Sequence, residues 1–245
     1  MFASLPACVS SYSSFRLVCC FGGDMHGVIT TYDNKKGTGR VQGDDGQIYF
    51  FSRDMVAKAE DIPSLMMEME ADFTPVQGEG RMEAHELSLT DPDSFQDKIL
   101  YYNEPQGFLC EKEDLVSGFD VLDRGLYRLS RSERSEEKAR YALIRECVDL
   151  GANALVSYKV ETQLKIAIGF SYEVVVCSGV PVVLGRLNPN GDARAEDLKH
   201  RIDQEKIKKL HNAMVNTKIG KMVIKALAAV LIVIFTLGFF FSGGV

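Results

Sequence analysis

The sequence contains no tryptophan, only four histidines, and no two cysteines at the two-residue spacing of a metal site. It also has no Gly-Lys-Ser/Thr phosphate loop, and no serine or cysteine stands in the context of a nucleophile elbow. We therefore expect a protein that is not an enzyme and that has no catalytic residue, no metal ligand and no cofactor. An active site assembled from distant residues stays open as the alternative.

Charge and composition exclude several further classes of protein. The 28 Lys and Arg residues are outnumbered by 34 Asp and Glu residues, and the net charge of −6 argues against a strongly basic nucleic-acid binder. With 46% hydrophobic and 25% charged residues, the chain is not a collagen, a disulfide-dense toxin, a fully disordered chain or a polytopic membrane protein. Its 245 residues allow one large or two small domains.

The six cysteines do not form a disulfide framework. Three lie in residues 1–24, and the other three are widely separated in apolar segments, which is typical of a reduced cytosolic protein. The only basic residue of this N-terminal extension, Arg16, lies too late for the charged start of a signal peptide. Two interpretations stay open: residues 1–24 are not native and Met25 is the natural start, or they form an ordered segment that packs on the body.

The C-terminal end of the chain is long and apolar. Residues 226–241 (ALAAVLIVIFTLGFFF) carry no charge, and none follows before residue 245. Twenty such residues in a helix span about 30 Å, the hydrocarbon thickness of a bilayer. We expect residues 222–245 to be one transmembrane helix, with a buried core helix as the alternative. Lys218, Lys221 and Lys225 precede it, so we expect them at the membrane surface, where they attract anionic lipids, with the N-terminal body in the cytoplasm.

A basic segment precedes this expected anchor. Residues 199–225 hold eight Lys and Arg residues but only two acidic ones, and apolar residues recur at helical spacing from Leu198 to Met214. We expect residues 188–221 to form a basic neck, with a turn at 188–191 and a helix from Asp192 to Met214. A rigid stalk, a bundle with other copies and an interfacial helix stay open as its role.

Residues 25–88 show the alternating pattern of short strands separated by turns that contain glycine. The expected strands cover residues 26–32, 39–41, 47–51, 69–73 and 81–87. Five short strands in so few residues favour a small closed barrel.

The stretch HGVITTYDNKKGTGRV and the following IYFFS resemble the opening strands of cold-shock domains, which are OB-type barrels. This resemblance implies that single-stranded nucleic acid stacks on aromatic side chains and meets basic ones, here Tyr32, Lys35, Lys36, Arg40, Phe50 and Phe51. Thr31, Thr38 and Arg40 replace three aromatic residues of the family, and each lost stacking contact costs about 1–3 kcal/mol of binding free energy. We therefore expect a reused scaffold that serves as a protein-interaction module, with residual nucleic-acid binding as the alternative.

Residues 89–95 are expected to be a short polar linker, and residues 96–187 a second, α+β domain. Its strongest signal is a helix from Ser132 to Leu150, because Ser132 precedes an acidic first turn and Gly151 follows the end. Strands are expected at residues 99–102, 154–160, 164–168, 171–178 and 180–184, with a strand-like or mixed stretch at 118–129. This order suggests one sheet covered by the helix.

The segments ALIRECVDLGANALVSYKVE and GFSYEVVVCSGVPVVL resemble the YbjQ-like family, which is sometimes labelled heavy-metal-binding. The resemblance implies a ring-like homo-oligomer, a pentamer or a multiple of one, that forms through sheet edges. A soft metal needs Cys or His ligands, but this stretch has no histidine and no paired cysteines. We therefore expect Cys147 and Cys177 to be core residues.

The expected fold is multidomain and mainly β: a small OB-like β-barrel, an α+β YbjQ-like domain, a basic helix and one transmembrane helix. The expected function is that of a non-enzymatic, tail-anchored scaffold. Its expected partners are other copies of itself, the lipid membrane and an unidentified protein. A membrane-tethered protein that binds single-stranded nucleic acid is the first alternative, and a metal or ligand sensor is the second.

Overall fold

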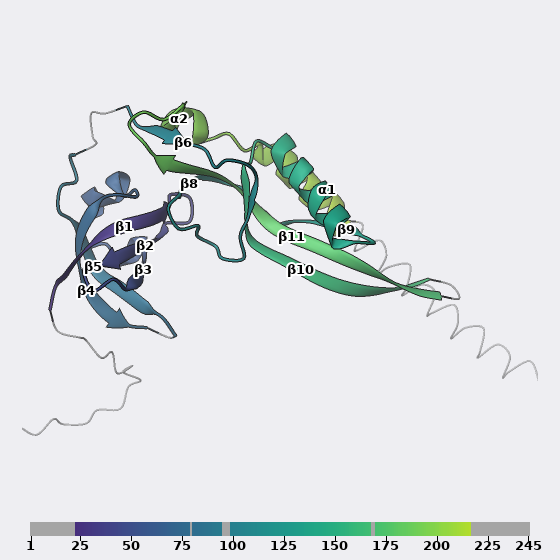
Figure 1. Cartoon of the computed structure of the whole chain (residues 1–245), viewed down its shortest axis with the longest axis horizontal. Coiled ribbons are helices and arrows are strands. Elements are labelled where there is room, and N and C mark those ends of the chain that lie inside the picture. The colour runs from purple at the N-terminus through teal and green to yellow at the C-terminus, as the bar shows by residue number, and fades with distance from the viewer. Residues whose placement is uncertain (1–22, 79, 95–98, 168–169, 217–245) are drawn as a thin grey trace, which may run out of the picture.

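The computed structural model describes residues 23–78, 80–94, 99–167 and 170–216. This part of the chain is mainly β, with a barrel at one end and a long two-stranded hairpin covered by a helix at the other (Figure 1). The expected transmembrane helix at 222–245 lies outside the described residues, as do Lys218, Lys221 and Lys225. No helix within the described ranges is long and apolar enough to span a membrane.

The barrel at the N-terminal end contains five strands. They are β1 (Met25–Asp33), β2 (Thr38–Gly43), β3 (Ile48–Ser52), β4 (Glu70–Gln77) and β5 (Met82–Leu89), with two short 3-10 helices, η1 (Arg53–Met55) and η2 (Ala59–Ser64), after β3. The strands follow the order β1-β2-β3-β5-β4, and β4 pairs back with β1 to close the barrel. The five strands expected from the sequence are confirmed, and this closed barrel is compatible with an OB-like fold.

Alternation of apolar and polar residues explains the barrel. Along each strand every second side chain points inward, and Ile29, Val41, Tyr49 and Phe73 are buried in this way. The turn between β1 and β2 contains Gly37 at a φ of +70°, a conformation that glycine adopts without steric cost.

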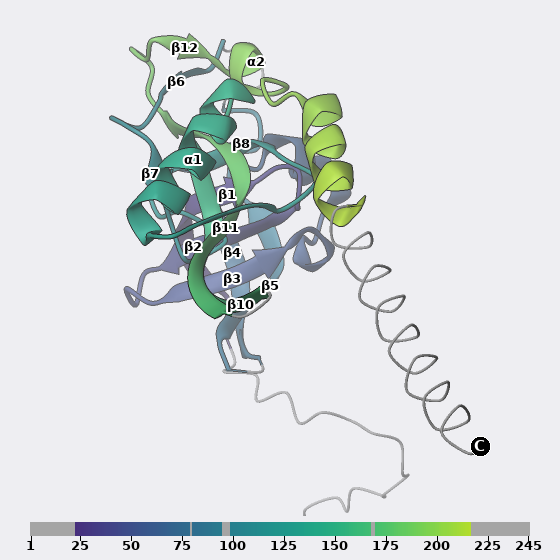
Figure 2. The ribbon, with the colours of Figure 1, turned by 90° about the vertical axis from the view of Figure 1, so that its right-hand side faces the viewer.

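The remaining elements form a second unit, defined here as residues 99–216 without 168–169. Its strands are β6 (Tyr101–Asn103), β7 (Leu109–Cys110), β8 (Asp120–Arg124), β9 (Leu129–Glu133), β10 (Ala154–Ala167), β11 (Phe170–Leu187) and β12 (Ala193–Arg194). Two of its helices are α1 (Glu136–Asp149) and α2 (Ala195–Leu198). A further helix covers residues 204–216. Figure 2 shows α1 and the helix over 204–216 on the same side of the β10–β11 sheet, where both contribute to one apolar core.

The four short strands expected between residues 154 and 184 are two long antiparallel strands in the structure. β10 and β11 pair continuously from Lys159 with Ser178 to Ala167 with Phe170, so the polar residues 161–163 do not break β10. A hairpin that projects from the body can expose both faces, and polar side chains in it therefore remain solvated. A bulge in β10 around Ser157, between Val156 and Lys159, interrupts the register once.

Helix α1 begins later than the sequence pattern indicates. Ser132 was expected to precede the first turn, but it lies in β9 and pairs with Val176. Ser135 caps the helix instead, and its side chain accepts a hydrogen bond from the Lys138 backbone N–H. The inward face of α1 buries Ala139, Leu143 and Cys147 against the sheet.

The expected continuous helix from Asp192 to Met214 is interrupted. The Ile202 backbone N–H donates to Asp123 at 2.9 Å, and Asp203 accepts from the Lys206 backbone N–H at the start of the last helix. Leu198, Ile202 and Ile207 are buried in the core of the second unit. The described part of the basic neck is therefore packed onto the body, because its apolar residues are buried there and Asp123 holds the chain between the two helices.

Candidate functional site

Strand β8 connects the barrel to the second unit. It pairs antiparallel with β11 and, at Val121, parallel with Asp33 at the end of β1. Asp120 and Asp123 on β8 are buried although both are acidic. Buried carboxyl groups require hydrogen-bond partners, and these partners come from both sides of the junction.

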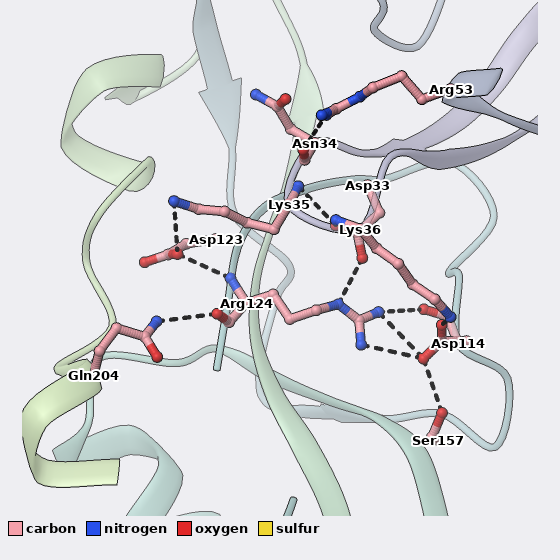
Figure 3. A network of polar contacts seen from close by, with 10 residues as sticks. All are labelled: Asp33, Asn34, Lys35, Lys36, Arg53, Asp114, Asp123, Arg124, Ser157 and Gln204. Atoms are coloured by element: carbon pink, nitrogen blue, oxygen red, sulfur yellow. Dashed lines mark hydrogen bonds and ion pairs between the residues drawn. The ribbon is translucent and has the colours of Figure 1, made fainter. Parts of the chain in front are cut away.

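The Arg124 guanidinium at the end of β8 lies between two acidic side chains (Figure 3). Its Nε donates to Asp33 Oδ2 of the barrel at 2.6 Å, and its Nη atoms donate to Asp114 Oδ1 at 3.2 Å. The Asp33 side chain is fully buried, and the Arg124 side chain is 13% exposed. This is therefore a largely desolvated ion pair that joins the barrel to the second unit.

Asp114 has two further partners, one in the second unit and one in the barrel. The Ser157 hydroxyl donates to Asp114 Oδ1 at 2.9 Å, and Ser157 has a φ of +50°, which residues other than glycine rarely adopt. The bulge in β10 therefore places this hydroxyl toward the network. Lys36 of the barrel forms an ion pair with the other Asp114 oxygen.

Asp123 extends the network to the C-terminal segment. Its Oδ2 accepts from the Ile202 backbone N–H, and its Oδ1 lies 3.9 Å from Lys35 Nζ. The Gln204 side chain donates to the Arg124 carbonyl at 3.0 Å, as Figure 3 shows. The barrel, β8 and the start of the helix over 204–216 are thus joined by polar contacts.

Asp120 holds two segments of the barrel. One of its oxygens accepts from the Tyr32 backbone N–H at 2.8 Å, and the other accepts from the Met67 backbone N–H at 2.9 Å. Burial raises the pKa of Asp120 to about 7, against the lowering effect of these two hydrogen bonds. Asp120 therefore titrates in a range where an exposed aspartate is fully ionised.

A hollow of about 520 Å³ opens between β2, β3 and the acidic segment 113–115. Arg40 and Glu113 form an ion pair on one side of it. The guanidinium carbons of Arg40 and Arg81 each lie 4.9 Å from the Phe50 ring centre. The hollow thus combines an aromatic ring with three cations, and each cation has an acidic partner: Asp114 for Lys36, Glu113 for Arg40 and Glu83 for Arg81.

The structure separates the six candidate nucleic-acid-binding residues. Lys36, Arg40, Phe50 and Phe51 line the hollow, while Lys35 faces Asp123. Tyr32 and Phe51 are each only 2% exposed, and their rings stack in the barrel with centres 5.9 Å apart. Two of the three aromatic side chains that the resemblance assigns to stacking therefore lie inside the barrel, and Phe50 is the one that is not buried.

Two of the three positions at which cold-shock domains carry aromatic residues, Thr31 and Arg40, contact the second unit. The Thr31 hydroxyl donates to the Phe119 carbonyl, and Arg40 pairs with Glu113. In the acidic run 111–114, Glu113 and Asp114 pair with barrel cations. Arg81 and Arg124 were missed. The sequence shows only that basic and acidic residues occur in similar numbers, and these numbers do not identify which residues form pairs.

The cysteines of the second unit are free thiols. Cys147 and Cys177 are buried in its core, as expected, and burial raises the pKa of Cys147 to about 12. Tyr158 places its hydroxyl 3.2 Å from Cys177 Sγ. Within residues 23–216, as far as the structure describes them, no three His, Cys, Asp or Glu side chains are grouped closely enough to hold a metal ion.

Comparison with protein-family models gives no match, and comparison with curated proteins gives no significant match. The two family resemblances therefore depend on the residues quoted above. The closed five-stranded barrel is compatible with an OB-like fold on its own geometry.

Proposed function

We propose that this chain is a non-enzymatic, tail-anchored membrane protein that forms a homo-oligomeric ring or cage. In this proposal the YbjQ-like region assembles the copies, and the OB-like barrel is held on the assembly as a protein-interaction module. The C-terminal apolar run anchors the chain, and Lys218, Lys221 and Lys225 meet anionic lipids at the cytoplasmic surface.

One observation carries the role of the barrel. Thr31, Lys36 and Arg40 lie on the face that a cold-shock domain uses for nucleic acid, and all three contact the second unit. A nucleic-acid binder needs these positions free for bases and phosphates. Because these residues instead contact the second unit, they favour a barrel that is held in a fixed orientation relative to it. A scaffold requires such a fixed orientation.

Crosslinking in intact membranes, followed by native mass spectrometry in detergent, tests the assembly. We expect the full-length chain to resist alkaline extraction and to form one discrete multimer without bound nucleic acid. Only monomer at native abundance would contradict the scaffold, and release from membranes by alkali would contradict the anchor.

A second candidate function is the binding of a single nucleic-acid strand in the hollow around Phe50. The three cations that line the hollow with this ring favour it, because cations attract phosphate and aromatic rings stack on bases. It requires the ion pairs of Lys36 with Asp114, Arg40 with Glu113 and Arg81 with Glu83 to open.

Salt-dependent binding of labelled single-stranded RNA distinguishes the two candidates. The second candidate predicts binding that weakens in Phe50→Ala, strengthens in Glu113→Gln and is unchanged in Ile48→Ala, an exposed residue of the same strand. No binding at low salt would exclude it.

A further inference from the structure

The far end of the β10–β11 hairpin exposes apolar side chains. Leu164, Ile166, Phe170 and Tyr172 are 62%, 83%, 63% and 40% exposed. Figure 1 shows this end of the hairpin projecting away from both the barrel and α1. A group of exposed apolar residues of this kind marks a site that interacts with a protein or a membrane.

These side chains lie on both faces of the hairpin. Paired residues of antiparallel strands share a face, and the pairs are Leu164 with Glu173, Lys165 with Tyr172 and Ile166 with Ser171. Leu164 and Ile166 therefore occupy one face. Phe170 and Tyr172 occupy the other, with ring centres 5.9 Å apart. A docked protein or a second copy would cover one face of the hairpin, whereas lipid surrounds an inserted end on both faces. Apolar residues on both faces therefore favour a lipid surface as the partner.

The helix over 204–216 runs toward the same end of the hairpin. It begins beside Arg124, to which Gln204 donates, and Met214 reaches Ser130, whose hydroxyl lies 3.6 Å from its sulfur. Because β9 continues from there toward Val175 of β11, the helix follows the direction of the hairpin. Val215, in the last described turn of this helix, and Gln163 of β10 line one hollow.

Chain lengths limit how far the start of the apolar run can lie from the hairpin end. From Gln163 to Ala167 the strand advances about 13 Å at the usual rise per residue. Positions 216 and 226 are ten residue steps apart, and this length of chain spans about 15 Å as a helix and about 33 Å when extended. If residues 226–241 cross a membrane, its surface is within reach of the hairpin end.

We propose that the hairpin end, defined as Leu164, Ile166, Phe170 and Tyr172, inserts into the interfacial region of the lipid bilayer beside the anchor. This inference rests on the proposed tail anchor. Aromatic and aliphatic residues are favoured at the interface between headgroups and acyl chains. Insertion stops at this depth because the free strand edges need water or headgroups as hydrogen-bond partners.

The absence of tryptophan makes a direct test possible, since one substitution introduces a single tryptophan whose emission can be followed. Full-length Phe170→Trp is reconstituted in phosphatidylcholine and phosphatidylserine vesicles, with and without brominated acyl chains. We expect its emission to shift to shorter wavelength and to lose intensity with the brominated lipids. Tyr141→Trp, on the exposed face of α1, is the matched control and should show neither change.

Phe235→Trp, within the apolar run, separates this inference from the anchor. Quenching of Phe235→Trp together with exposed, unquenched emission from Phe170→Trp would overturn the insertion and leave the anchor intact. A short-wavelength, unquenched emission from Phe170→Trp would also overturn it, because a protein would then cover the hairpin end. An unquenched Phe235→Trp would instead contradict the proposed anchor.

Discussion

At the residue scale, Arg124 is the side chain on which the contacts between the barrel and the second unit converge. It pairs with Asp33, which is fully buried, and with Asp114. The pair need not stabilise the fold more than an apolar contact would, because burying both charges has a desolvation cost. Removing only the cation, however, leaves a buried carboxylate without its partner.

We therefore expect Arg124→Met to lower the free energy of unfolding by about 3–5 kcal/mol. Arg145→Met, which removes an exposed arginine from α1, is the matched control and should change it by less than about 0.5 kcal/mol. Urea unfolding of the full-length chain in detergent, followed by circular dichroism, measures both. Equal effects of the two substitutions would show that Asp33 does not depend on Arg124.

Asp120 predicts a pH dependence of stability. Its pKa is raised from 3.8 to about 7 by burial, so the folded state favours the protonated form. The stabilising effect of protonation is complete below pH 3.8 and is lost as the pH rises to about 7.

Asp120→Asn should remove this dependence, because an amide stays neutral while its oxygen still accepts a hydrogen bond. The unfolding free energy of the variant minus that of the natural chain should therefore increase by on the order of 2–4 kcal/mol from pH 4 to pH 8. Urea unfolding across this range measures the gain, with the exposed Asp44→Asn as control. A constant difference between variant and natural chain at all pH values would refute the titration.

At the element scale, the ends of helices and strands depend on contacts that a local pattern does not contain. Ser132 and Ser135 both precede acidic residues, yet only Ser135 accepts a hydrogen bond from α1. Ser132 remains in β9 because β11 pairs with it. The start of the helix is therefore decided by the neighbouring strand.

Ser135→Ala should cost about 1 kcal/mol of unfolding free energy, the usual effect of losing a helix N-cap. Ser132→Ala removes the same hydroxyl three residues earlier, where it accepts from the Lys165 side chain and caps no helix, and should cost less. Urea midpoints of the two variants compare the positions directly. A larger loss in Ser132→Ala would place the cap where the sequence pattern indicates it.

At the scale of the whole molecule, β8 makes the barrel and the second unit parts of one folded body. It pairs with β1 and β11, and its side chains hold the barrel, the acidic segment and the C-terminal helix. The Met67 side chain of the barrel also belongs to the core of the second unit. The two parts should therefore open together.

Native-state hydrogen exchange of the full-length chain tests this cooperativity. Amides of β1 near Asp33 and amides of β8 should exchange through the same opening, with equal dependence on denaturant. In Arg124→Met we expect the two sets to separate. Separate openings in the natural chain would mean that the barrel folds independently of β8.

Local chemistry was sufficient to predict much of the fold. Alternation and turn glycines identified the five barrel strands, and acidic residues followed by apolar spacing identified α1. The apolar surroundings of Cys147 and Cys177 predicted their burial. These features are encoded by residues that are close together in the chain, so periodicity and turn chemistry reveal them.

The sequence by itself determined the barrel strands, α1 and the apolar C-terminal run, because each depends on neighbouring residues. Only the tertiary structure decided that Arg124 meets Asp114 and also Asp33, which precedes Arg124 by 91 positions. It also decided that Tyr32 and Phe51 lie inside the barrel and that β10 and β11 extend beyond their cover. The charge and polarity of a side chain do not specify its partner, since that partner depends on where the whole chain places it.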